Sequence, residues 1–144
     1  MKISGFTFVK NADKFYFPVK ASILSILNIV DEFVIAYAEG DKDDDTLNII
    51  KSINSDKIKI YQRQWDPIAM KDGQIYADET NFALSKCTGD WCFYLQADEC
   101  IHEEDHDKIL KDLLNGKEFT TLRADGNLKK AFAEAGLYGR GLGV

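Results

Sequence analysis

The most informative segment of this chain reads Thr88-Gly89-Asp90-Trp91-Cys92-Phe93-Tyr94-Leu95-Gln96-Ala97-Asp98-Glu99. The Thr-Gly pair ends a helical pattern, and the apolar run from residue 91 to 95 predicts a short buried strand. Carboxylates follow that strand almost at once. We therefore expect them at the carboxyl edge of a sheet, where oxygen ligands suit a hard cation.

The rest of the chain up to residue 114 alternates between strand and helix periodicity. Strands are expected at residues 2–9, 33–37, 57–61 and 91–95, and helices at 18–28, 46–53, 74–86 and 103–114. Asp44 or Asp45 is the expected cap of the second helix, because a carboxylate can accept its free amides. This order predicts an α/β fold with a doubly wound, mostly parallel sheet and right-handed crossovers.

In a doubly wound sheet, ligands bind beyond the carboxyl ends of the strands. The loops expected at those ends are residues 10–14, 39–45, 62–72 and 96–101. Polar or acidic side chains cluster in three of these four loops. The sequence therefore predicts that a binding site lies at this edge.

Composition limits the possible functions. The 144 residues make one domain, of which 45% are hydrophobic and 29% charged, and the net charge of −6 disfavours a nucleic-acid binder. No apolar run reaches the roughly 20 residues of a membrane span, and no signal peptide is recognisable. Three cysteines (Cys87, Cys92 and Cys100) have no disulfide-framework spacing, which favours reduced thiols and a cytoplasmic protein.

The last 30 residues differ from the rest. The last isoleucine is Ile109, whereas six of the ten glycines lie between residues 116 and 143. We expect one folded domain over residues 1–114 and a glycine-rich tail over 115–144, partly helical (about 127–135) or disordered. Too few residues remain for a second core.

The segment at residues 88–99 resembles family 2 glycosyltransferases of the GT-A fold, in which an apolar strand leads into an Asp-X-Asp triplet. Four other segments match that family in order and spacing: 8–11, 31–35, 39–46 and 81–84. The resemblance covers about residues 2–110. It implies a Rossmann-like nucleotide-diphospho-sugar transferase fold that is incomplete at its C-terminus, since family members continue into an acceptor-binding half.

The same resemblance implies a set of site residues. Asp98 takes the place of the metal-binding aspartate, with Mn²⁺ or Mg²⁺ as the expected cofactor. Glu39, Phe8 and Asn11 fall where the nucleotide base is bound. Gln96 replaces the usual first aspartate of the triplet and offers a carbonyl to a ribose hydroxyl, but no charge. The full set expected to bind the nucleotide sugar is Phe8, Lys10, Asn11, Glu39, Asp45, Gln96, Ala97, Asp98 and Glu99.

The resemblance therefore implies inverting sugar transfer from a nucleotide-diphospho-sugar, with a UDP-sugar as the expected donor and an unknown acceptor. No residue of the chain is recognisable as the catalytic base. The alternative is a non-catalytic remnant or fragment that binds a nucleotide sugar or only a partner chain. A homo-oligomer or a partner chain is compatible with either hypothesis.

Ordinary structural explanations compete with each of these assignments. Asp98 and Glu99 can be a solvated turn, the run Asp41–Asp45 can be a loop and helix cap, and Trp65 and Tyr61 can be packing residues rather than sugar contacts. A calcium loop is excluded, because Thr46 replaces its glycine and Ser52 its closing glutamate. The cysteines and histidines match no zinc spacing.

Overall fold

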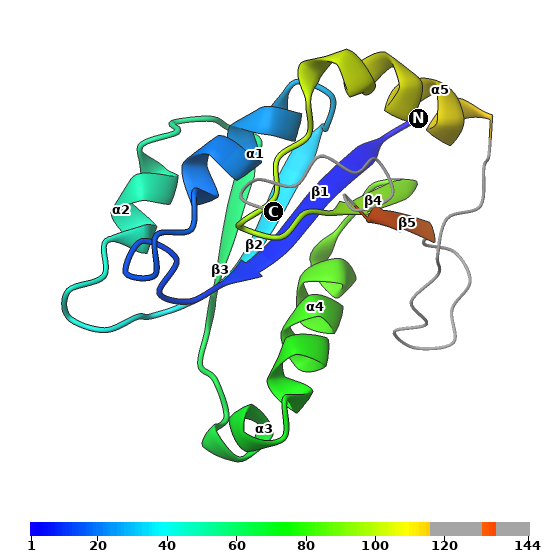
Figure 1. The fold of residues 1–144 in the computed structure, drawn as a ribbon. Coiled ribbons are helices and arrows are strands. Elements are labelled where there is room, and N and C mark those ends of the chain that lie inside the picture. The colour runs from blue at the N-terminus through cyan, green and yellow to red at the C-terminus, as the bar shows by residue number, and fades with distance from the viewer. Residues whose placement is uncertain (116–130, 135–144) are drawn as a thin grey trace.

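A computed structural model of the chain describes residues 1–115 and 131–134. Its single sheet has the strand order β3-β2-β1-β4-β5, and every neighbouring pair is parallel (Figure 1). The strands are β1 (Ile3–Val9), β2 (Glu32–Ala38), β3 (Ile58–Arg63), β4 (Trp91–Tyr94) and β5 (Ala131–Glu134). The predicted parallel α/β sheet is therefore confirmed.

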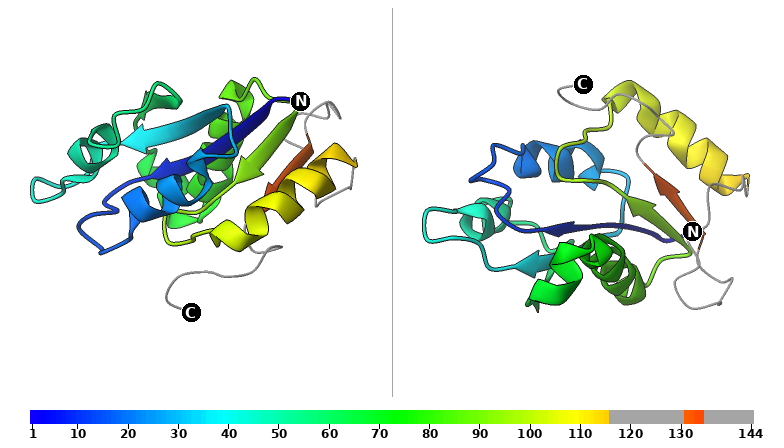
Figure 2. Two further views of the ribbon diagram at one scale, coloured as in Figure 1. Left: turned by 90° about the horizontal axis from the view of Figure 1, so that it is seen from above. Right: turned by 60° about the horizontal axis from the view of Figure 1, so that its bottom comes forward.

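Helices cover both faces of the sheet (Figure 2). They are α1 (Val19–Leu27), α2 (Thr46–Lys51), α3 (Pro67–Lys71), α4 (Gln74–Lys86) and α5 (His106–Leu114), with a 3₁₀ turn, η1, at Glu103–Asp105. Buried residues of α1, α2 and α5 share one hydrophobic cluster, and those of α4 share the other. None of the helices in the described part of the chain is long and apolar enough to cross a membrane.

The interior strand β2 shows why a continuous apolar run forms a strand here. Phe33, Ile35 and Tyr37 pack into the cluster with α1 and α5, whereas Val34 and Ala36 pack into the cluster with α4. Since successive strand residues point to opposite faces, a strand covered on both sides needs apolar residues at every position. A Cβ on Gly5 of β1 would lie 2.5 Å from Cδ2 of Phe33, so the neighbouring strand keeps a glycine there.

The amino edge of the sheet is tied together by the buried carboxylate of Glu32. Its Oε1 accepts hydrogen bonds from Ser4 Oγ (2.6 Å), Thr88 N (2.7 Å) and Thr88 Oγ1 (2.8 Å), and Lys59 Nζ lies 2.9 Å from Oε2. Burial alone raises the pKa of Glu32, but these donors outweigh it and lower the pKa to about 2. Glu32 therefore joins β1, β2, β3 and the turn before β4.

Two segments differ from the sequence prediction. Residues 131–134 form strand β5 rather than part of the helix expected at 127–135, because they pair with the open edge of β4 and that pairing overrides a weak local preference. The rest of the predicted tail lies outside the described residues. Helix α3 was not expected from the sequence, although Asp66 Oδ1 accepts a hydrogen bond from Ile68 N (2.9 Å) and Pro67 begins the helix, both recognised start signals.

Candidate functional site

The sheet topology opens a crevice between β1 and β4. The chain runs from β1 through β2 to β3 on one side, and then crosses back to place β4 on the other side of β1. The loops after β1 and β4 therefore turn in opposite directions, which is the position at which open α/β sheets bind ligands. A cavity of about 640 Å³ lies there. Its lining includes the predicted binding residues Phe8, Lys10, Asn11, Gln96, Ala97 and Asp98.

The turn after β4 is held by Glu99 and Ser22. Gln96 N donates to Glu99 Oε2 (3.0 Å), Glu99 N donates to the Gln96 carbonyl (3.0 Å), and Ser22 Oγ of α1 donates to the same carbonyl (2.9 Å). Glu99 thus shapes the turn that carries Gln96 and Asp98. The contact expected between Glu99 and the nucleotide sugar stays a prediction.

Asp98 is exposed at the end of this turn and lines the cavity. Within the described part of the chain, no donor lies within hydrogen-bond or ion-pair distance of its carboxylate. Residues 1–115 and 131–134 also contain no group of three or more His, Cys, Asp or Glu side chains arranged to hold a metal ion. A single carboxylate fits an ion such as Mg²⁺, which binds through one or two carboxylates together with substrate phosphates and water.

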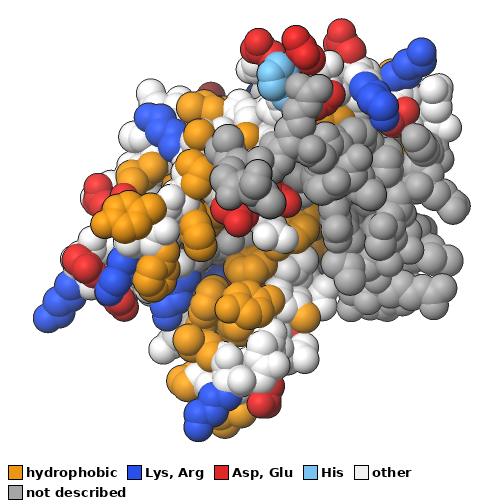
Figure 3. Space-filling view, in the orientation of Figure 1, with side chains coloured by type: hydrophobic (Ala, Val, Ile, Leu, Met, Phe, Trp, Pro, Cys, Tyr) orange, Lys and Arg blue, Asp and Glu red, His pale blue; other side chains and the backbone are white. Residues whose placement is uncertain are grey.

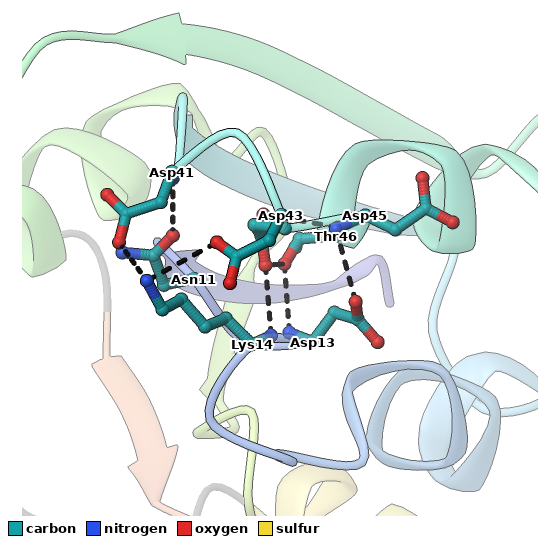
Figure 4. Close-up of polar contacts among 8 residues, drawn as sticks. Asn11, Asp13, Lys14, Asp41, Asp43, Asp45 and Thr46 are labelled. Carbon is teal, nitrogen blue, oxygen red and sulfur yellow. Dashed lines mark hydrogen bonds and ion pairs between the residues drawn. The ribbon is translucent and has the colours of Figure 1, made fainter.

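The loop after β1 is joined to the acidic loop after β2 (Figure 4). Asn11, which has a left-handed backbone (φ 55°), accepts a hydrogen bond from Asp41 N at its Oδ1 (2.7 Å). A Cβ on Gly40 would lie only 2.2 Å from that Oδ1, so this approach requires glycine. Asn11 therefore lines the cavity and also fixes the distance between the two loops.

The aspartates of the acidic loop are engaged with the protein. Lys14 Nζ lies 2.5 Å from Asp41 Oδ2 and 3.3 Å from Asp43 Oδ1, and its hydrogen bond holds the pKa of Asp41 below its usual value. Asp44 accepts hydrogen bonds from Lys14 N (3.1 Å) and from Thr46 N (3.2 Å), the first amide of α2. Asp45 is the N-cap residue of α2, but its side chain makes no cap hydrogen bond. These contacts support the structural explanation of the run.

Asp45 is, with Glu39, one of the two predicted binding residues of this loop, and it lines neither of the two cavities described here. Its amide donates to Asp13 Oδ2 (3.2 Å), and its Oδ1 accepts from Asn48 Nδ2 (2.8 Å). The residue precedes the first turn of α2. Its predicted contact with a nucleotide sugar stays a prediction. In the structure its contacts join the start of α2 to the loop after β1.

Glu39 lines a second cavity, of about 720 Å³, at the carboxyl ends of β2 and β3. Arg63 lies in the same lining and donates from Nε and Nη2 to the buried Glu79 of α4 at 3.0 to 3.3 Å. The guanidinium carbon also lies 3.7 Å from the ring centroid of Phe82. Arg63 is therefore held rigidly at the wall of this polar cavity.

An aromatic wall of the first cavity was not predicted from the sequence. Phe8 lies 6.3 Å from the ring of Trp65, 6.0 Å from Tyr76 and 6.5 Å from Tyr94, measured between centroids. Phe15, Phe17 and Met70 complete the apolar lining and are exposed. Figure 3 shows hydrophobic side chains gathered in a band on this face. Trp65 contributes to the lining, whereas Tyr61 packs against Phe82 in the cluster with α4.

Comparison with known proteins relates this chain to proteins named glycosyltransferases. No protein-family profile matches the sequence. An uncharacterized glycosyltransferase of Rickettsia typhi is 30% identical over 108 residues, which are 75% of this chain and 32% of that protein. One from Rickettsia prowazekii has the same identity and coverage. The chain spans about a third of the length of these relatives.

Solved structures share the fold. The crystal structure of S. aureus TarS 1–349 in complex with UDP superposes with a TM-score of 0.58 at 18% identity, covering 88% of this chain and 38% of that one. A second crystal structure of S. aureus TarS 1–349 superposes with a TM-score of 0.57 at 19% identity, covering 80% of this chain and 33% of that one. Sequence and fold together thus show a glycosyltransferase-like N-terminal part with a GT-A-like fold, as the segment at residues 88–99 predicts.

Proposed function

We propose that this chain binds a nucleoside-diphosphate sugar together with a divalent metal ion, for inverting transfer of the sugar to an acceptor hydroxyl. The observation that carries the proposal is the exposed carboxylate of Asp98, which has no partner within the described residues and lines the cavity between β1 and β4. The UDP complex of TarS, which has the same fold, supports a uridine nucleotide as the ligand.

In this proposal each edge residue has a separate task. Asp98 would hold Mn²⁺ or Mg²⁺, and the bound ion would supply positive charge to the departing diphosphate. Gln96 would accept a hydrogen bond from a ribose hydroxyl, and Glu39 would contact the base. The aromatic wall of Phe8, Trp65 and Tyr76 would exclude water from the sugar side.

Calorimetry with UDP, in Mn²⁺ and in a chelator, tests the proposal. We expect binding that depends on Mn²⁺, and Asp98→Ala should weaken the Mn²⁺-dependent affinity by about tenfold or more, since it removes the only charged metal ligand proposed. Asp56→Ala is the matched control, because Asp56 is exposed and lies before β3, at the other edge of the sheet. Equal affinity in Mn²⁺ and chelator would disprove the metal role.

Sugar transfer and donor binding are separable, because the chain spans about a third of the length of its relatives. Measuring release of UDP from UDP-sugars in Mn²⁺ separates an enzyme from a binding module. Release that Asp98→Ala abolishes supports transfer or hydrolysis by this chain. Tight UDP binding without any release supports the non-catalytic alternative.

A further inference from the structure

Two residues, Lys10 and Trp65, form the boundary between the two cavities of the candidate site. Both line the aromatic cavity beside Asp98 and the polar cavity beside Glu39. The Nζ of Lys10 lies over the indole of Trp65, 5.2 Å from the ring centroid. The pair joins the end of β1 to the segment that follows β3.

The two outermost ligand contacts of the proposed function lie on opposite sides of this boundary. Asp98 belongs to the aromatic cavity and Glu39 to the polar one. A nucleoside diphosphate that reaches Glu39 with its base and Asp98 with its metal-bound phosphates must therefore pass along Lys10 and Trp65. This step rests on the proposed function, which supplies both the Glu39 contact and the Asp98 contact.

Lys10 has no carboxylate partner within the described residues, in contrast to two other cations near the carboxyl edge. Lys14 is paired with Asp41, and Arg63 is paired with Glu79. No Asp or Glu of the described residues lies within ion-pair distance of Lys10 Nζ. The indole Nε1 of Trp65 is likewise buried without a hydrogen-bond acceptor in the described part of the chain. The ammonium of Lys10 thus remains available to a ligand, whereas the indole N–H of Trp65 is unsatisfied but closed to solvent in this conformation.

We propose that Lys10 is a diphosphate-binding residue, and that its ammonium leaves the Trp65 ring for the phosphates when a nucleoside diphosphate binds. The ring holds the ammonium only through a cation–π contact at a half-buried site, which is weaker than a charge-assisted hydrogen bond to phosphate. The exchange also neutralises charge in a region where Glu39 and Asp98 repel an anionic ligand. Trp65 would then face the ribose that links base and phosphates.

The test compares UDP with uridine, which has the same base and ribose but no phosphates. In Mn²⁺, Lys10→Met should weaken UDP binding by about tenfold or more, because methionine keeps the packing on Trp65 but removes the charge. Uridine affinity should stay unchanged in the same variant, which also shows that the site is still folded. Lys10→Arg should restore most of the UDP affinity. Lys51→Met, on the exposed side of α2, is the matched control.

Trp65 fluorescence reports the exchange directly. The chain has two tryptophans, so Trp91→Phe leaves Trp65 as the sole indole emitter. UDP should change that emission, and the change should disappear when Lys10→Met is added. If wild-type protein binds UDP and Lys10→Met binds it equally well, the inference is wrong while the proposed function stands. If the wild-type protein binds no UDP in Mn²⁺, both are wrong.

Discussion

The amino and carboxyl edges of this sheet both carry carboxylates, but they use them differently. At the amino edge, Glu32 is 2% exposed and accepts from Ser4 and Thr88 while pairing with Lys59. Asp31 and Asp90 also accept hydrogen bonds there, from the backbone amides of Ile3 and Lys2 respectively, each at 2.8 Å. At this edge the protein itself supplies the donors.

At the carboxyl edge, Asp98 and Glu39 are exposed and face cavities. Neither has a hydrogen-bond or ion-pair partner within the described residues. Exposed carboxylates keep their hydration and gain little from protein contacts, so they remain able to bind a ligand. The segment at residues 88–99 spans both edges, and its first half is structural while its second half faces the candidate site.

The largest expected effect is a difference in stability between variants at the two edges of the sheet. Glu32→Ala should lower the free energy of unfolding by about 3–5 kcal/mol, because it removes the buried charged acceptor that Ser4, Thr88 and Lys59 share. Denaturant unfolding followed by far-UV circular dichroism measures this loss. Glu39→Ala, at the carboxyl edge, should change stability by no more than about 0.5 kcal/mol. Similar losses in the two variants would remove the contrast between the edges.

The acid dependence of stability gives the second effect. The pKa of Glu32 is about 2 in the folded chain against an ordinary value of 4.5. Its ionised form is therefore favoured by folding, and its contribution is complete above about pH 4.5 and is lost as the pH falls through about 2. The loss amounts to about 3 kcal/mol. Between pH 5 and pH 2, the free energy of unfolding of the wild type should fall by this amount more than that of Glu32→Gln, which has no ionisable group at residue 32. An equal fall in both proteins would contradict the assignment.

Most of the fold could be predicted because its signals are local. The apolar runs and helical spacings up to residue 114 lie within single elements, and helix α4 has the predicted bounds of residues 74–86. Strand β5 could not be predicted in this way, since residues 131–134 become a strand only by pairing with β4. Helix α3 has five residues, too few for a periodic pattern, and only its Asp66-Pro67 start was visible in the sequence.

The candidate site also has a part that the sequence predicts and a part that it does not. The positions of Asp98 and Lys10 follow from the order of the parallel strands, which brings the loops after β1 and β4 together. The aromatic wall does not follow, because the contacts of Trp65 and Tyr76 depend on the path of the segment between β3 and α4. Sequence patterns also cannot distinguish the buried, structural Glu32 from the exposed Glu39, since burial is a property of the fold.

The smallest expected effect concerns Gln96, which stands where the first aspartate of the triplet is usual. Gln96→Asp should tighten Mn²⁺ binding by about threefold to tenfold, because a second carboxylate beside Asp98 adds Coulomb attraction, partly offset by repulsion between the two carboxylates when no metal is bound. Titration with Mn²⁺ in the presence of UDP measures it. Asn54→Asp is the control, since it adds the same charge at an exposed position before β3, at the other edge of the sheet, and should leave Mn²⁺ affinity unchanged within about twofold. Equal tightening in both variants would indicate a general effect of net charge. Unchanged or weaker binding in Gln96→Asp would mean that residue 96 does not face the metal and that Asp98 acts without its neighbour.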